Sequence, residues 1–283
     1  MKASNFLYLK PKSLDEALAY LAANEEPRII AGGQSLVAAM NMKLAQPETI
    51  IDIGEIDDLN IFEATSNEVH IGALVTHSEI EFSKSSSKLI SFLREVSKNI
   101  AHTPIRSKGT FCGAVANSDP ASEWCSCLLA LDGSVEVIGQ DRQKRLVDSK
   151  EFFIAPYLTN IGFDEILVSI KFPEINKHTK LGFNEYARRA GDYAIAMCVS
   201  KLDMKGEKVV DGNIVIGAAT ETPIIAEKAK NFLKGKRLSE ETSWEAAVIA
   251  SENISILPDI DSSEEYKRDI VKAVTYRSLL ACS

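Results

Sequence analysis

The chain has 283 residues, about twice the length of a typical domain, so two domains are expected. Hydrophobic residues make up 45% of it and charged residues 25%, which excludes a disordered chain, a collagen-like repeat and a disulfide scaffold. Acidic residues outnumber basic ones by 40 to 32, giving a net charge of -8. A protein that binds the phosphate backbone of nucleic acids is therefore not expected.

The N-terminus lacks the apolar run and cleavage site of a signal peptide, and the chain holds no stretch of about 18 apolar residues. A cytoplasmic protein without a membrane span is expected. The number of cysteines is odd and their spacing shows no repeated Cys-x-x-Cys pattern, which favours neither a disulfide framework nor a zinc module. These cysteines are Cys112, Cys125, Cys127, Cys198 and Cys282.

The first predicted element is a helix over residues 13–23, in which Ser13 and Glu16 form a capping pair. A strand, a helix and a second strand follow over residues 28–31, 36–44 and 49–53. Next come a strand over 68–71, a Thr76/Glu79 capping box and a helix over 88–100. A glycine-rich irregular stretch is predicted over 101–120, followed by a helix over 121–131. A hairpin of 135–138 with 145–147 and a strand over 166–172 complete this part of the chain.

The polar, proline-led segment 173–177 is the predicted domain boundary. Beyond it, strands are predicted over residues 182–186, 194–202 and 213–218, the last two joined around Gly206 and Gly212. Helices are predicted over residues 226–233, 244–251 and 263–280. Because strands and helices are segregated, an α+β fold is expected rather than a doubly wound parallel sheet.

Two glycine-containing stretches carry the candidate chemistry. Residues 31–35 lie between a predicted strand and a predicted helix, where paired glycines and successive N–H groups can bind a diphosphate, although such turns are commonly only turns. The stretch is not the dinucleotide fingerprint, because its third glycine is missing. Residues 109–114 form the second stretch; Asp119 beyond it could accept from a ribose hydroxyl or cap the helix predicted to begin at 121.

At this point a family resemblance becomes specific. Residues 31–53, AGGQSLVAAMNMKLAQPETIIDI, resemble the diphosphate-binding segment of the flavin subunits of molybdenum hydroxylases, the xanthine dehydrogenase and carbon monoxide dehydrogenase family. Further matches follow in family order over residues 71–76, 105–110, 119–120, 187–194 and 263–268. The resemblance therefore spans nearly the whole chain.

The resemblance implies an FAD-binding domain of PCMH type over residues 1–175, with two α/β subdomains split near residues 55–60. A C-terminal α+β domain with a small antiparallel sheet and a helical bundle would occupy residues 176–283. The residues that it places at the cofactor are Ala31, Gly32, Gly33, Gln34, Ser35, Leu36, Thr76, Ile105, Thr110, Phe111, Cys112, Gly113, Ala114, Asp119, Glu123, Ile166, Leu167 and Tyr193. The backbone near Leu167 and the ring of Tyr193 map beside the flavin, with core packing as the alternative for Tyr193.

The second loop departs from the family pattern, which usually reads threonine, isoleucine, glycine, glycine, asparagine. This chain keeps Thr110 and Gly113 but has Phe111, Cys112 and Ala114 at the other positions. The loop thus lacks one glycine and the amide side chain of the family pattern. Cys112 could lie beside the FAD or simply pack as a small hydrophobe.

The implied function is that of an FAD-binding electron-transfer subunit. Electrons would reach it from the 2Fe-2S clusters of a small partner subunit, substrate would react on a large molybdopterin subunit, and the assembly would be a dimer of heterotrimers. No catalytic or metal-ligating residue is expected on this chain, because the redox chemistry belongs to the cofactor. Cys125 and Cys127 are predicted to pack inside a helix, since residues two apart point to different faces.

Two alternatives stay open. One is a self-sufficient flavin oxidoreductase of related fold, which would reduce its own flavin. The other is a non-catalytic scaffold that has lost FAD, which the altered second loop brings into consideration.

Overall fold

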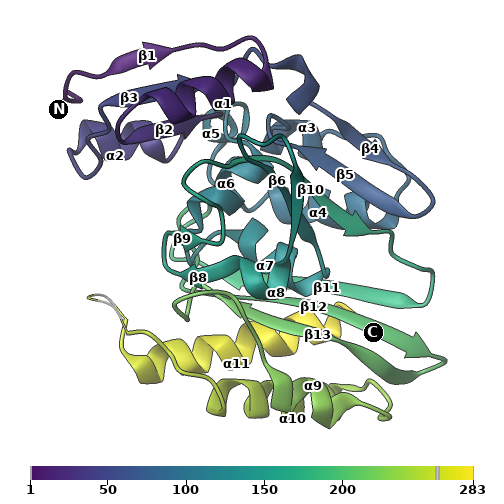
Figure 1. Cartoon of the computed structure of the whole chain (residues 1–283). Coiled ribbons are helices and arrows are strands. Elements are labelled where there is room, and N and C mark those ends of the chain that lie inside the picture. The colour runs from purple at the N-terminus through teal and green to yellow at the C-terminus, as the bar shows by residue number, and fades with distance from the viewer. Residues whose placement is uncertain (1, 259, 261, 283) are drawn as a thin grey trace.

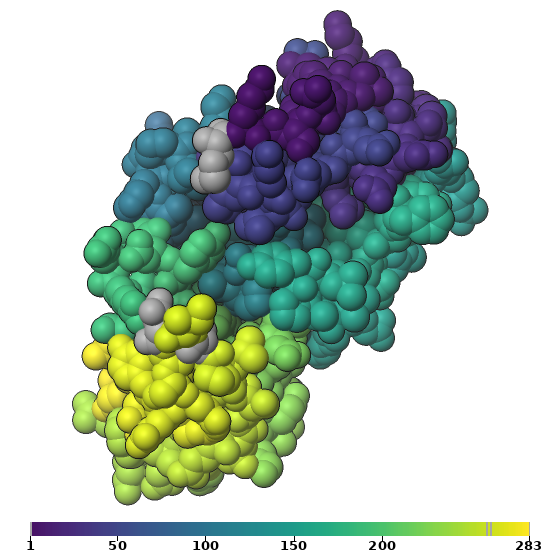
Figure 2. All heavy atoms as spheres, turned by 90° about the vertical axis from the view of Figure 1, so that its left-hand side faces the viewer, coloured from purple at the N-terminus to yellow at the C-terminus, as the bar shows by residue number. Residues whose placement is uncertain are grey.

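The computed structural model describes residues 2–258, 260 and 262–282. It is an elongated molecule in which the N-terminal residues and the C-terminal helices lie at opposite ends (Figures 1 and 2). In the described residues, three sheets of three or more strands succeed one another between these ends (Figure 1), and a fourth sheet has only two short strands. The fold is α+β, as predicted, although its first sheet is wholly parallel.

The first sheet has the order β1-β3-β2 and comprises β1 (Leu7–Leu9), β3 (Thr49–Asp52) and β2 (Pro27–Ile30). Helices α1 (Leu14–Ala23) and α2 (Leu36–Asn41) connect its strands. Ser13 begins α1 by accepting a hydrogen bond from the backbone N–H of Glu16 at 3.2 Å, so the predicted cap is confirmed. Strand β1 was not predicted, because it has three residues and no buried side chain.

The second sheet is antiparallel, in the order β4-β5-β10-β6-β7. Its strands are β4 (Phe62–Ala64), β5 (Glu68–Gly72), β6 (Ser134–Ile138), β7 (Lys144–Asp148) and β10 (Ile166–Pro173). The helices of this region are η1 (Asp57–Leu59), α3 (His77–Glu81), α4 (Lys88–Ser97), α7 (Glu123–Ala130) and α8 (Ser149–Phe152), and β8 (Phe153–Ala155) pairs with β9 (Leu158–Thr159). The predicted Thr76/Glu79 capping box is confirmed.

The prediction of an irregular stretch over residues 101–120 is wrong. It contains α5 (Thr103–Arg106) and α6 (Phe111–Asn117). The Thr110 hydroxyl caps α6 by accepting from the Gly113 N–H at 3.0 Å, and Phe111 and Val115 are fully buried. Capping and burial together outweigh the cost of about 1 kcal/mol for a glycine inside a helix.

The third sheet is antiparallel, in the order β11-β12-β13-β14. It comprises β11 (Thr179–Tyr186), β12 (Ala196–Lys205), β13 (Lys208–Gly217) and β14 (Ile224–Ile225), and α9 (Glu227–Leu233), α10 (Glu240–Glu252) and α11 (Glu264–Leu280) complete the C-terminal part. Gly206 lies in the β12–β13 connection as predicted, whereas Gly212 lies inside β13, opposite Leu202.

The third sheet lies between two layers of helices. Helix α11 packs on β11 and β12, and α7 packs on β12 and β13 (Figure 1). The buried residues form two clusters, one running from the first sheet through α7 to Val199 and Val215, the other between the third sheet and the C-terminal helices. Helix α7 is buried along its whole length, so it joins the two halves of the molecule.

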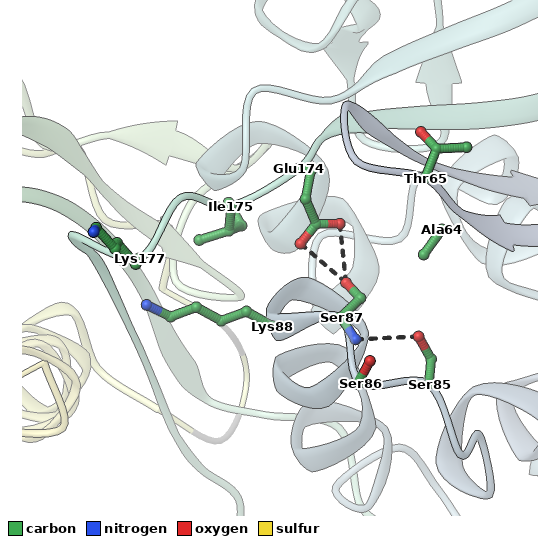
Figure 3. A pocket seen from close by; sticks show the side chains of 9 residues that line it. All are labelled: Ala64, Thr65, Ser85, Ser86, Ser87, Lys88, Glu174, Ile175 and Lys177. Atoms are coloured by element: carbon green, nitrogen blue, oxygen red, sulfur yellow. Dashed lines mark hydrogen bonds between the residues drawn. The ribbon is translucent and has the colours of Figure 1, made fainter.

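The segment between β10 and β11 is tied to the N-terminus of α4 (Figure 3). The Ser87 hydroxyl donates to the Glu174 carboxylate at 3.0 Å, and the Lys88 ammonium donates to the carbonyl of Thr179. A hollow of about 390 Å³ lies at this junction, lined in part by Ser85, Ser86 and Lys177. None of the residues predicted to contact a cofactor lines it. Among the described helices, none is both long enough and apolar enough to cross a bilayer.

Candidate cofactor-binding site

The turn after β2 is built by close approach of two backbone segments. A Cβ atom on Gly32 would lie 2.1 Å from the carbonyl oxygen of Lys108, so only glycine permits this contact. Gly33 has a φ of +71°, which again favours glycine. The Gln34 side chain donates to the Gly32 carbonyl at 3.0 Å and so braces the turn from within.

The segment opposite this turn is held by a short antiparallel contact. Thr76 pairs with Thr110, and the backbone N–H of His77 donates to the Gly109 carbonyl at 2.9 Å. The N–H and the hydroxyl of Thr76 both donate to the Glu79 carboxylate at 2.7 Å. The fold thus brings together two threonines, Thr76 and Thr110, that lie 34 positions apart in the sequence.

A cavity of about 300 Å³ opens between these segments. It is lined by Ala31, Gly32, Gly54, Asp57, Asn60, Leu74, Thr76, Glu79, Ser107, Lys108 and Thr110. Four of the lining residues were predicted from the sequence. Of the others, Ser107 and Lys108 belong to the matched stretch 105–110, whereas Gly54, Asp57 and Asn60 carry no recognisable signal and reach the cavity only through the path of the chain.

Below the cavity, His77 joins this region to α7. The indole N–H of Trp124 donates to Nδ1 of His77 at 2.9 Å, which makes that nitrogen an acceptor. His77 is 5% exposed, and burial first, then the Arg106 charge, lowers its pKa to about 4. The imidazole is therefore neutral near pH 7.

A second group of predicted residues lies where α6 ends and α7 begins. One oxygen of Asp119 accepts from the Ala121 N–H at 2.9 Å, and the other accepts from the Tyr157 hydroxyl at 3.1 Å. Helix α7 begins at Glu123 with Ser122 as its N-cap residue, so Asp119 closes the turn before the helix rather than capping the helix. The Tyr193 ring is 70% exposed, which contradicts its core-packing alternative.

Acidic side chains with raised pKa values surround this second group. Burial raises the pKa of Glu123 to about 8, with a further contribution from Glu185, and burial raises the pKa of Glu185 to about 7. The pKa of Tyr193 is raised by desolvation and then by the fields of Asp119 and Glu123. Glu185 and Tyr157 were not predicted from the sequence; no motif distinguishes them.

Helix α6 connects the two groups. It begins after Thr110 at the cavity and ends at Asn117, two residues before Asp119, and its seven residues rise by about 10 Å. Phe111 and Cys112 are buried, being 0% and 2% exposed, so neither presents surface to a ligand, whereas Gly113 and Ala114 are half-buried.

The other predicted residues differ in exposure. Ile105 on α5 is 36% exposed. Ile166 and Leu167 begin β10 opposite Ile138 and Val137, and both are buried.

Cys125 and Cys127 are fully buried in α7, as predicted. Burial raises the pKa of Cys125 to about 12 and raises that of Cys127 strongly, so both thiols stay protonated. Within residues 2–258, 260 and 262–282, no group of three or more histidine, cysteine, aspartate or glutamate side chains is arranged to hold a metal ion.

The sequence and the fold match a known family along nearly the whole chain. The model of the FAD-binding domain in molybdopterin dehydrogenase matches residues 3–175, and that of the CO dehydrogenase flavoprotein C-terminal domain matches residues 182–282. The chain belongs to the family of FAD-binding subunits of molybdopterin dehydrogenases, as the sequence motifs predicted. It is an oxidoreductase subunit.

Individual relatives cover the chain from end to end. It is 34% identical to the nicotine 6-hydroxylase medium subunit of Paenarthrobacter nicotinovorans, over 99% of this chain and 98% of the relative. It is 30% identical to the carbon monoxide dehydrogenase medium chain of Afipia carboxidovorans, over 99% and 97%. Among solved structures, a chain of quinoline 2-oxidoreductase from Pseudomonas putida 86 superposes with a TM-score of 0.93 at 32% identity, covering 100% of this chain and 98% of that one.

Proposed function

We propose that this chain binds FAD between the glycine turn at residues 32–33 and the second group, which comprises Asp119, Glu123 and Tyr193. The bound FAD would pass electrons from the 2Fe-2S clusters of a partner subunit to a final acceptor. One observation carries this proposal: α6 joins the cavity at Gly32 and Thr110 to the group at Asp119 and Glu123. When bound, FAD supplies the redox chemistry, accepting and releasing electrons.

The residues around the cavity fit a diphosphate. Gly32 lets the turn lie directly against the backbone of Lys108, where a Cβ would collide, and main-chain N–H groups in such a glycine turn bind anions. Thr110 contributes a hydroxyl and Lys108 a positive charge at the wall of the same cavity. The main-chain contribution of residues 31–36 does not require the side chains of the second loop that depart from the family pattern.

The second group fits the sugar-like and aromatic parts of the cofactor. Carboxyl groups such as Asp119 and Glu123 pair with hydroxyls, and the exposed ring of Tyr193 offers a surface on which a flavin can stack. Thr76, Ile105, Ile166 and Leu167 complete the proposed contact set. In this proposal the chain orients the cofactor and excludes water from it, and no side chain of its own acts as acid, base or nucleophile.

Reconstitution tests the cofactor proposal. The purified chain is expected to take up FAD and to show flavin absorbance after gel filtration. A chain that takes up no FAD would support the scaffold alternative. Rapid reduction of the bound flavin by NADH or a small substrate, without partners, would support the self-sufficient alternative instead.

We further propose that the partners are a small 2Fe-2S subunit and a large molybdopterin subunit, in a dimer of heterotrimers. The support is that the relatives are named medium subunits or medium chains. Purification from the native source is expected to bring down both chains, with a native mass of two copies of each subunit. A mass corresponding to this chain alone would contradict the proposal.

The division into residues 1–175 and 176–283, with a subdivision near 55–60, is part of the same proposal. The ranges of the two family models and the membership of the three sheets support it. Limited proteolysis is expected to cut first within residues 174–178 and to release two protected fragments; a first cut inside a sheet would contradict it. A cytoplasmic location is supported by five free, buried cysteines and is tested by fractionation of cells.

A further inference from the structure

Two glutamates from opposite halves of the molecule meet where α7 lies on the third sheet. The strand register places Glu185, Met197 and Gly217 in one row across the sheet. A Cβ on Gly217 would lie 2.1 Å from the Ser126 hydroxyl of α7. Glu123 lies three residues before Ser126 and therefore on the same face of that helix. The row consequently points Glu185 toward the first turn of α7.

Both carboxyl groups are poorly solvated. Glu123 is 8% exposed, and Oε2 of Glu185 is enclosed without a hydrogen-bond partner among the described residues. The hydroxyl of Ser126, in the same layer, also lacks a partner there. An ionised carboxylate in such surroundings is costly, so a buried carboxyl without a cation tends to keep its proton.

The charges that reach the pair are negative. Besides Glu185, the group that raises the pKa of Glu123 is Asp119, in the segment before α7. Tyr157 and Tyr193 face the same region from the β8–β9 turn and from the segment before β12, and their pKa values are raised by desolvation first and then by the charge of Asp119.

The other groups packed around α7 do not neutralise the pair. The thiols of Cys125 and Cys127 lie on α7 itself, and burial keeps both protonated. Lys201 of β12 binds Asp132 at 2.6 Å, beyond the other end of α7. Within the part of the chain that the structure describes, no cation contributes to the pKa shift of Glu123 or of Glu185.

Resting on the proposed function, we propose that Glu185 is a positioning residue for the FAD site, which keeps a proton on Glu123 so that this side chain meets the cofactor as a neutral hydrogen-bond donor. Two neighbouring buried carboxyls do not both ionise near pH 7, and the remaining proton belongs to the pair. A neutral carboxyl can donate a hydrogen bond to an acceptor atom in the sugar-like part of the cofactor, whereas a carboxylate at the same place could only accept. The raised pKa values of about 8 and about 7 agree with this geometry.

The first test is a titration of the full chain with FAD, followed by fluorescence and repeated from about pH 6.5 to about pH 9.5 in steps of about half a unit. The affinity of the wild type is expected to fall by up to about tenfold for each pH unit above about 8, because FAD then has to bind the minor, protonated form. Glu185→Gln removes the neighbouring charge and is expected to move the decline to lower pH, giving about tenfold weaker binding at pH 8. Glu123→Gln is expected to abolish the decline.

The matched control is Glu151→Gln, an exposed glutamate on α8, which is expected to titrate like the wild type. Circular dichroism of each variant checks that it folds. A wild-type affinity that stays constant or rises between pH 7 and pH 9 overturns the inference, and so does a Glu185→Gln profile that superposes on the wild type. Failure of the wild type to bind FAD at any pH overturns the proposed function itself.

Calorimetry measures the proton uptake that accompanies FAD binding, a quantity that would not change if Glu123 and Glu185 had only a structural role. Measured in two buffers of different ionisation enthalpy at pH 8.5, FAD binding to the wild type is expected to take up about 0.8 of a proton, because Glu123 has to be protonated in the complex. Glu123→Gln is expected to take up none, while Glu151→Gln matches the wild type. Release of a proton by the wild type would show that the carboxylate form binds, and would overturn the inference.

Discussion

The two halves of the candidate site are built by different physical means. At Gly32 the backbone of one segment touches the backbone of another, and the shape of the cavity depends on the absence of a side chain. At Glu123 and Glu185 the geometry depends on side chains whose charge varies with pH. The first half should therefore be sensitive to volume and indifferent to pH, and the second half the reverse.

The largest expected effect comes from adding volume to the backbone-built half. In Gly32→Ala the new Cβ would lie 2.1 Å from the Lys108 carbonyl oxygen, so the two segments must separate. We expect FAD binding to weaken by at least about 1,000-fold, which corresponds to about 4 kcal/mol. Fluorescence titration with FAD measures it.

Gly139→Ala is the matched control for this change. Its Cβ would meet no atom closer than 3.7 Å, an ordinary contact, so FAD affinity should stay within about twofold of the wild type. Wild-type affinity in Gly32→Ala would break the comparison, because it would show that the cavity does not depend on the backbone contact.

The second effect tests the charge-built half of the site, through the pH dependence of the stability that Glu123 contributes. Glu123 has a folded pKa raised from 4.5 to about 8, so the folded chain binds more protons than the unfolded chain between those values. Its contribution to stability is complete below about pH 4.5 and is lost as the pH rises through about 8, by on the order of 5 kcal/mol. Urea unfolding of Glu123→Gln is expected to show a flatter profile over this range, and a loss as steep as that of the wild type would contradict the prediction.

Most of the fold could be predicted because its elements carry local signals. Ser13 and Thr76 indicate the starts of the helices that they cap, and the alternation along residues 166–172 indicates β10. Helix α6 was missed because Gly109 and Gly113 suggested a loop. Its stability comes instead from the burial of Phe111 against Trp124, with ring centroids 4.6 Å apart, a contact that local sequence does not reveal.

The candidate site divides in the same way. The glycine turn, Thr110 and Asp119 were found because their residue types sit beside predicted element boundaries. Glu185 was not, because it is one polar residue on a strand, and its importance depends on a register that brings it under α7. Asp57 and Asn60 likewise reach the cavity only through the tertiary path of the chain.

The third effect is a loss of stability at acid pH, and it comes from His77, which is hydrogen-bonded to Trp124 of α7. The pKa of buried His77 is lowered from 6.5 to about 4, so the unfolded chain binds more protons than the folded chain between those values. The stability is complete above about pH 6.5 and is lost as the pH falls through about 4, by about 3 kcal/mol. His77→Asn keeps an acceptor for Trp124 but cannot titrate, so its acid unfolding should begin at lower pH; His178→Asn, at an exposed position, should leave the profile unchanged.

The smallest expected effect is a loss of stability at the junction of α4 with the segment before β11, without a change in FAD binding. Ser87→Ala removes both the cap of α4, where the hydroxyl accepts from the Ile90 N–H at 3.3 Å, and the bond to Glu174. We expect a loss of about 1 kcal/mol in the free energy of unfolding, with FAD affinity unchanged, whereas exposed Ser86→Ala should cost less than about 0.5 kcal/mol.

Glu174→Gln resolves the two contributions of Ser87, because it weakens the link to the segment before β11 and leaves the cap in place. In a double-mutant cycle, the coupling between Ser87→Ala and Glu174→Gln measures that link alone and is expected to be about 0.5 kcal/mol. A coupling of zero would mean that the junction is held by packing and by the Lys88 bond to Thr179. A coupling accompanied by altered FAD affinity would mean that the junction also sets the distance between the backbone-built and the charge-built halves of the site.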